Sequence, residues 1–405
     1  AGNELQGRPV TLTWSIVPDG TAAPDGGLDF GPSNFREWLA GLIGGDKDAA
    51  DPTDELWFRP VQEGFDRIAE ETGITFVYEP NDDGAPIDLG GGIGDGVLGV
   101  RGDIRVSARA IDGPSGILAF AFFPDIGDMV FDSSDDYFDN SATDPERFIN
   151  TLSHEIGHSL GLEHVCPISE TKLMEPFASD NINGPQYDDV HSLHRLYGDI
   201  LEVHSGVRDN DSVANATPLP LSADALSYQY LSIDDDTDVD YFKFSSPAGR
   251  QLTVLISPAD PFGTTYLEGP QTDACDTGNA FNPRSRHNLG LELLDATGTT
   301  VITAATSAPL GQQELIRNFV LPGAGDYIIR VSGDPSNIAQ LYRMQAKLDF
   351  AVDAPALVID STELVDESNI PNNGFPDPGE TVRYEVTVTN QNDVDAEGVE
   401  ASLSG

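Results

Sequence analysis

The segment from Leu152 to His164, LSHEIGHSLGLEH, constrains the fold of this chain more than any other. It includes the end of the stretch Arg147–Leu160, in which apolar side chains recur every three or four residues, as on one face of an α-helix. Gly161 follows, and glycine readily takes the positive φ that ends a helix and reverses the chain. We therefore predict a helix that stops at Gly161 and a chain that turns back on itself.

The polar residues of this segment predict a metal site. His154 and His158 are four residues apart, so both imidazoles leave the same face of the helix. The turn at Gly161 lets His164 return as a third ligand. Glu155 stands beside the first ligand, where its carboxylate can reach a metal-activated water rather than the metal. Three neutral nitrogen ligands leave one coordination position open, which is typical of catalytic rather than structural zinc.

These residues resemble the HExxHxxGxxH signature of the metzincin metalloproteases, and Met174 in KLMEP resembles their methionine turn. Within the metzincins the chain is similar to the matrixins over nearly all of residues 10 to 200. The parts that carry the similarity are the calcium loop with its edge strand, the next strand with its acidic loop, and the closing helix, at Asp112–Pro124, Gly127–Asp135 and Asp188–Gly198. The resemblance implies a secreted zinc endopeptidase acting on extracellular proteins.

The resemblance also implies roles for single residues. Glu155 is the general base, whereas Gly161 and Met174 are structural. An extended protein or peptide substrate would pair with the edge strand and enter a pocket beyond the scissile bond. The corresponding substrate-binding positions are Leu118 and Ala119 on the strand and Pro176 and Phe177 in the pocket wall.

The metals implied by the resemblance are one catalytic zinc and structural calcium. Matrixins hold a second zinc with histidines, but the matching positions here are Arg105, Ser107, Phe120 and Val130, so we expect a single zinc. The expected calcium ligands are the carboxylates of Asp112, Asp132 and Asp135 with the carbonyls of Gly113, Ser115 and Ile117. Asp128 is a candidate for a second calcium. The alternative is that aspartates in glycine-rich loops only form turns.

The pattern of elements changes near residue 203. Before it, helix-like and strand-like segments alternate, which predicts an α+β domain over residues 1–203 with a mixed twisted sheet. After it, short strands recur with Gly, Pro and Asp turns, which predicts an antiparallel β-sandwich over 204–350. Asp238–Phe244 and Gly323–Val331 resemble the bacterial pre-peptidase C-terminal domain. Residues 351–405 resemble the start of an immunoglobulin-like β module, so we expect a multidomain chain.

The run Asp234–Asp236, with Asp238 and Asp240, is open to two interpretations. It can bind calcium, or it can be a solvated acidic loop, and the sequence favours the solvated loop.

Charge excludes several classes of partner. The 405 residues include 68 Asp and Glu against 21 Lys and Arg, which gives a net charge of −47. Such a field repels phosphate backbones, so we expect no nucleic-acid partner. No apolar run is long enough to span a membrane. A surface this acidic suits a marine or saline extracellular setting, although it also serves plain solubility.

The two cysteines, Cys166 and Cys275, lie in turn-like surroundings. For a secreted protein we predict a disulfide that fixes the second domain beside the active-site loop, and two free thiols are the alternative.

The sequence thus favours a zinc metalloendopeptidase whose C-terminal β domains aid stability, substrate binding or attachment to a cell surface or matrix. The alternative is a non-catalytic adhesion or polysaccharide-binding protein with a protease-like head. The intact set of ligands and Glu155 favour the enzyme, because a binding module needs no general base.

Overall fold

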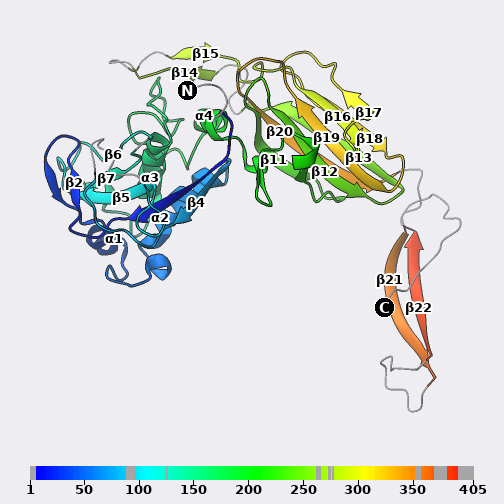
Figure 1. The fold of residues 1–405 in the computed structure, drawn as a ribbon, viewed down its shortest axis with the longest axis horizontal. Helices are drawn as coiled ribbons and strands as arrows, with labels where there is room; N and C mark the ends of the chain where they lie inside the picture. The colour runs from blue at the N-terminus through cyan, green and yellow to red at the C-terminus, as the bar shows by residue number, and fades with distance from the viewer. Residues whose placement is uncertain are drawn as a thin grey trace.

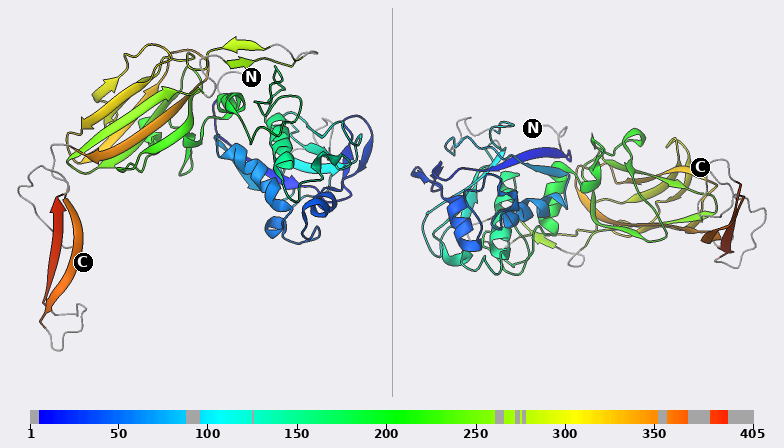
Figure 2. Two further views of the ribbon diagram at one scale, coloured as in Figure 1. Left: turned by 180° about the vertical axis from the view of Figure 1, so that it is seen from behind. Right: turned by 90° about the horizontal axis from the view of Figure 1, so that it is seen from below.

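The computed structural model describes residues 6–87, 96–124, 126–260, 266–271, 275, 278–351, 357–368 and 381–390. A first domain of mixed sheet and helices lies beside a β-sandwich, and a two-stranded ribbon extends from the far end of the sandwich (Figure 1). The two further views separate the same three parts (Figure 2). The predicted order, an α+β domain followed by all-β structure, is confirmed.

The first domain is built on a five-stranded sheet with the strand order β4-β1-β5-β7-β6. Its strands are β1 (Val10–Ile16), β4 (Ile74–Tyr78), β5 (Ile104–Arg109), β6 (Ala119–Ala121) and β7 (Met129–Asp132). The pairs β1–β4, β1–β5 and β5–β7 are parallel, and β6 pairs antiparallel with β7. The short strand β6 therefore forms one edge of the sheet.

Helices cover the sheet and enclose the core of this domain. They are α1 (Phe35–Ile43), α2 (Phe58–Ala69), α3 (Glu146–Ser159) and α4 (Tyr187–Tyr197). Alternate residues of β1 and β5 point into this core, where Trp14 stacks on Phe65 of α2 with 4.4 Å between ring centroids. α3 adds Leu152 and Ile156 to the same cluster. Burial of these apolar side chains is the main force that fixes α3 on the sheet.

The predicted helix Arg147–Leu160 is observed as α3, with bounds that differ by one residue at each end. The carboxylate of Asp144 accepts a hydrogen bond from the backbone N–H of Glu146 in the first turn. Glu146 also pairs with Arg67 of α2 at 2.8 Å, which ties the start of α3 to its neighbour.

The second domain consists of two packed sheets with the strand orders β10-β12-β19-β16-β17 and β11-β20-β13-β18. The first sheet contains β10 (Thr217–Pro218), β12 (Val239–Ser246), β19 (Gly325–Ser332), β16 (Gly290–Asp295) and β17 (Val301–Ala305). The second contains β11 (Leu226–Ile233), β20 (Gln340–Phe350), β13 (Arg250–Pro258) and β18 (Glu314–Val320). The pairing is antiparallel except between β10 and β12. Sequence reasoning located most of these strands but not β10, β11 or β20.

Four two-stranded sheets complete the described structure. They are formed by β2 (Ala22–Pro24) and β3 (Phe30–Pro32), β8 (Val203–His204) and β9 (Val207–Arg208), β14 (Tyr266–Glu268) and β15 (Asn279–Phe281), and β21 (Leu357–Glu367) and β22 (Val382–Asn390). The last pair belongs to the region predicted as immunoglobulin-like, which stays a prediction.

The two domains contact each other through α4. Tyr187 and Val190 of this helix pack with Ala259 and Leu341 of the sandwich. The described helices include none that is long and apolar enough to cross a membrane.

Candidate active site

Three histidines at the C-terminal end of α3 converge on one point. His154 and His158 lie one turn apart on the helix, and the chain reverses at Gly161, whose φ is +101°. The reversal returns His164 to the helix, where its Nε2 lies 3.1 Å from Nε2 of His154 and 3.1 Å from Nε2 of His158. The structure thus brings together the three residues that the sequence predicts as metal ligands.

The opposite ring nitrogens set the tautomer of each histidine. Every Nδ1 lies beside an oxygen that can only accept a hydrogen bond: 2.7 Å from Leu173 O for His154, 2.7 Å from Leu162 O for His158, and 2.8 Å from Gln271 Oε1 for His164. Nδ1 therefore carries the proton, and each Nε2 presents a lone pair to the other two. Three converging lone pairs fit a cation, and this donor set with one open position fits zinc.

Burial keeps the rings of His154 and His158 neutral. Desolvation lowers the pKa of His154 to about 3 and the pKa of His158 to about 4. Neutral imidazole is the form that binds a metal.

Glu155 lies buried beside the histidines, with 4% of its surface exposed. Its Oε2 has no hydrogen-bond partner within the described part of the chain. Burial raises the pKa of the Glu155 carboxyl to about 8. Glu155 lines the same cleft as the histidines, and in its ionised form it can accept a proton from a water molecule there.

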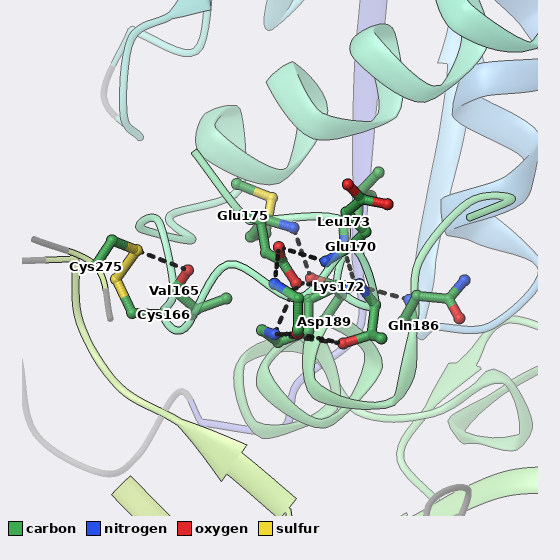
Figure 3. A network of polar contacts seen from close by, with 12 residues as sticks. Val165, Cys166, Glu170, Lys172, Leu173, Glu175, Gln186, Asp189 and Cys275 are labelled. Atoms are coloured by element: carbon green, nitrogen blue, oxygen red, sulfur yellow. Dashed lines mark hydrogen bonds and ion pairs between the residues drawn. A yellow bond between two sulfur atoms is a disulfide. The ribbon is translucent and has the colours of Figure 1, made fainter. Parts of the chain in front are cut away.

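The loop that follows the third histidine carries Met174 under α3. Gly157 of the helix faces this methionine, and a Cβ at Gly157 would overlap Met174 Sδ and lie 3.2 Å from its Cε. The buried carboxylate of Asp189 accepts the backbone N–H of Leu173 at 2.9 Å and that of Met174 at 3.1 Å (Figure 3). Asp189 thus fixes both the turn at Met174 and the carbonyl that orients the first histidine.

A buried ion pair stabilises the same loop. Lys172 Nζ lies 2.7 Å from Glu175 Oε1, and both side chains are at most 2% exposed. The Glu175 carboxylate also accepts backbone N–H groups of the loop, those of Ser169, Glu170, Thr171 and Lys172 (Figure 3). Removing one partner of such a pair leaves a buried charge without a partner, which is strongly destabilising. Sequence reasoning included both residues in the methionine-turn segment KLMEP but gave neither a role.

A cleft of about 700 Å³ extends across the histidines and Glu155. Its lining includes Leu118 and Ala119 at the β6 edge of the sheet, and Pro176 and Phe177 in the segment after Met174. All four residues predicted to bind substrate therefore line one cleft. The edge strand beside this cleft suits pairing with an extended chain.

The first domain matches a known family over residues 50–198, the Matrixin family. The chain contains a matrixin domain. The matched relatives include Matrix metalloproteinase-2 of Drosophila melanogaster, 36% identical over 95 residues, which cover 22% of this chain and 12% of that protein. Stromelysin-3 of Xenopus laevis is 41% identical over 93 residues, which cover 22% of this chain and 18% of that protein. The matched segment thus spans less than a fifth of either relative.

The sandwich matches the family described as Bacterial pre-peptidase C-terminal domain over residues 238–333. Similar solved structures include the pre-peptidase C-terminal domain of a Bacillus anthracis collagenase, at 11% identity. That similarity covers 33% of this chain and 94% of the other, with a TM-score of 0.21. The predicted pairing of a matrixin domain with a pre-peptidase C-terminal domain is confirmed.

The loop of the matrixin domain predicted to bind calcium is held by its own hydrogen bonds. Asp132 accepts backbone N–H groups from the loop, including that of Gly113 at 2.9 Å. Asp135 accepts from Ser115 at 3.1 Å, and Asp112 accepts from Ile117 at 3.1 Å. Among the described residues these three carboxylates do not form a group of converging ligand atoms. They form turns in this structure, and calcium at this loop stays a prediction.

Asp128, the candidate ligand for a second calcium, lies beside an arginine in this structure. It is fully buried, and its Oδ2 lies 3.7 Å from Nη1 of Arg105. Burial raises the pKa of Asp128 to about 8, against the opposing charge of this guanidinium. Arg105 also pairs with Asp82 at 2.7 Å. This ion pair disfavours a calcium ion at Asp128, and a second calcium there stays a prediction.

Apolar side chains stand at the positions of β6 and β7 where the resemblance to matrixins would place ligands of a second zinc. Phe120 of β6 is paired with Val130 of β7. Val130 is fully buried in a cluster with Val17, Ala23 and Ile87, against which Phe120 packs. These side chains offer no zinc ligand, so a single zinc per chain stays our prediction.

Cys166 and Cys275 form a disulfide with a Cα–Cα distance of 5.2 Å (Figure 3). It joins the loop after the third histidine to the β14–β15 hairpin of the second domain. The predicted bridge is therefore present in the structure. The same hairpin brings Gln271 to His164, a contact that sequence reasoning missed because 107 residues separate the two.

The acidic run is buried except at Asp236, so the preferred expectation of a solvated loop was wrong for the other four aspartates. Asp234 is 4% exposed, Asp238 7% and Asp240 0%. They meet Asp199 and Glu202, which follow α4, so the carboxylates collect where the two domains join. The groups with ligand atoms within 4.8 Å of one another are Asp199 with Glu202 and Asp240, and Glu202 with Asp234 and Asp238.

We call these five carboxylates the junction cluster. Burial and mutual repulsion raise their pKa values, to about 8 for Asp234 and well above the usual range for Asp238 and Asp240. Oδ1 of Asp238 is buried without a hydrogen-bond partner in the described part of the chain.

Proposed function

We propose that this chain is a zinc-dependent endopeptidase that cleaves extended segments of extracellular proteins. One observation supports it most directly. Three Nε2 lone pairs converge beside the free carboxylate oxygen of Glu155, inside a cleft open along an edge strand. A matrixin domain that lacked Glu155 or one of the three ligands would not support this proposal.

The residues of the chain divide the chemistry among them. Zinc, when bound, acts as a Lewis acid that acidifies water and polarises the scissile carbonyl. His154, His158 and His164 hold it and leave one position open to the cleft. Glu155 accepts a proton from the attacking water and passes it to the leaving amine. Oε2 of Glu155 accepts no other hydrogen bond in the described part of the chain, so it is free to accept this proton.

Substrate binding follows from the two walls of the cleft. An extended peptide would add to the outer edge of β6 near Leu118 and Ala119 and form main-chain hydrogen bonds there. Pro176 and Phe177 form the facing wall and would contact the side chain beyond the scissile bond. Phe177 is 67% exposed, so an apolar substrate side chain would cover a surface that water now contacts.

Structural calcium belongs to the same proposal, and the junction cluster is a better donor set for it than the loop around Asp112. In the loop the carboxylate oxygens already accept backbone N–H groups. In the junction cluster, the buried Oδ1 of Asp238 lacks such a partner, and the carboxylates repel one another. A hard divalent cation with oxygen ligands would neutralise them.

Location and domain boundaries complete the proposal. The disulfide suits an oxidising compartment, so we infer secretion. A net charge of −47 suits saline surroundings, where salt screens repulsion between surface charges. We keep the boundaries 1–203, 204–350 and 351–405, with the C-terminal β domains as the candidates for attachment to a cell surface or matrix.

A non-catalytic adhesion or polysaccharide-binding protein remains the second candidate, supported by the two β regions after the matrixin domain. Incubation with an unstructured protein distinguishes the two. The enzyme should fragment it, lose activity with a zinc chelator and regain activity when zinc is restored. Intact substrate after prolonged incubation with the zinc-loaded chain would contradict the proposal.

A further inference from the structure

The β14–β15 hairpin of the second domain reaches over the first domain (Figure 1) and lies against the loop after the third histidine. Val165 forms an isolated antiparallel bridge with Pro270. The backbone N–H of Cys166 donates to Gly269 O at 2.8 Å, and that of Gln271 donates to His164 O at 3.1 Å. A three-residue piece of each domain is thus paired like two strands.

The side chain at the end of this pairing contacts the metal centre. Gln271 Oε1 lies 2.8 Å from Nδ1 of His164. The matching acceptors of His154 and His158 are backbone carbonyls of the matrixin domain itself, those of Leu173 and Leu162. One of the three ligands is therefore oriented by a side chain from the other domain.

We propose that Gln271 is a positioning residue for zinc, so that the pre-peptidase C-terminal domain completes the metal centre of the matrixin domain. The inference rests on the proposed function only in assuming that the histidines bind zinc. An acceptor at Nδ1 holds His164 in the tautomer that leaves Nε2 free, and it limits rotation of the ring. His164 needs this restraint because it lies on a loop, whereas α3 carries the other two ligands.

The disulfide explains how Gln271, an exposed residue, can orient the ring of His164. Gln271 is exposed to solvent, so water competes for its amide oxygen. The Cys166–Cys275 bridge and the backbone bonds hold residues 269–271 beside His164. The same residue therefore contacts His164 with both its backbone and its side chain, and little further freedom is lost when the second contact forms.

The test compares three variants of the full chain. Gln271→Leu keeps the approximate size but removes the acceptor, Gln271→Glu keeps an acceptor, and Leu267→Ala changes an exposed residue of the same hairpin as a control. Zinc affinity is measured by competition with a chromophoric chelator. The absorption spectrum of the cobalt-substituted protein reports the geometry of the ligands, and urea unfolding reports stability.

We expect Gln271→Leu to bind zinc about 10- to 100-fold more weakly and to alter the cobalt spectrum, with unchanged unfolding. Gln271→Glu should bind zinc at least as tightly as wild type, and Leu267→Ala should match wild type. Equal zinc affinity of Gln271→Leu and wild type would overturn this inference alone, as would an equal loss in Gln271→Glu and Gln271→Leu. A wild-type chain that binds no zinc would overturn the proposed function as well.

Discussion

The disulfide between the domains makes a prediction whose size follows from the chain itself. Replacing both Cys166 and Cys275 by serine opens a loop of 109 residues. In the chain-entropy model a crosslink over a loop of this length lowers the entropy of the unfolded chain enough to contribute about 5 kcal/mol. Compactness of the denatured chain reduces this figure, so we expect the double variant to lose between about 2 and 5 kcal/mol.

Urea unfolding followed by tryptophan fluorescence measures this loss. The three tryptophans, Trp14, Trp38 and Trp57, all lie in the first domain, so the signal reports the unfolding of the domain that carries the active site. Wild-type protein with a reductant is the matched control, since it lacks the crosslink but keeps the cysteines. It should unfold at the same urea concentration as the double variant. A variant as stable as oxidised wild type would refute the loop-closure reasoning, and two reactive thiols in denatured, non-reduced wild type would refute the bridge.

Two further predictions concern packing and charge. Gly157→Ala should destabilise the fold in urea unfolding, because the overlap with Met174 costs about 1–3 kcal/mol and outweighs the gain of about 1 kcal/mol in helix propensity. In a Met174→Ala background the same substitution should cost less, and an equal cost would exclude the contact with Met174 as the cause. Carboxyls with a raised pKa retain protons that the unfolded chain loses as the pH rises. Without calcium, the contribution of the junction cluster to stability is therefore complete below about pH 4 and disappears as the pH rises through about 8, the pKa of Asp234. Asp238→Asn should therefore become more stable relative to wild type as pH rises, and calcium at pH 8 should raise the melting temperature of wild type more than that of the variant; equal responses to pH and calcium would contradict this account.

Local patterns carried most of what the sequence could predict. The three histidines and Glu155 lie within eleven consecutive residues, so helical spacing and one glycine turn were enough to place them. The strands of the sandwich were found where alternation and turn residues coincide. β20 was missed although its sequence, QLYRMQAKLDF, alternates apolar residues with charged and amide ones along most of its length.

Contacts between distant segments could not be predicted in this way. Gln271 reaches His164 only because the hairpin of the second domain folds back over the first. Asp199 and Asp240 meet because α4 packs on the sandwich. Burial then raises the pKa of carboxyls, such as that of Asp240, in a run that the sequence alone indicates to be solvated. The surroundings of Asp128, which directly precedes β7, depend on Arg105 of β5, whose Nη1 lies 3.7 Å from Oδ2 of Asp128. Such burial and charge pairing arise from tertiary structure.

The most direct test of the central claim is Glu155→Gln, assayed for bound zinc and for cleavage of an unstructured protein in the same preparation. The amide leaves the three histidines intact but cannot accept a proton from water. We predict one zinc per chain in wild type and variant alike, with cleavage by the variant reduced about 10²- to 10⁴-fold or more. Cleavage by Glu155→Gln at the wild-type rate would contradict the role of Glu155, and a wild-type chain that cleaves without zinc would contradict the whole account.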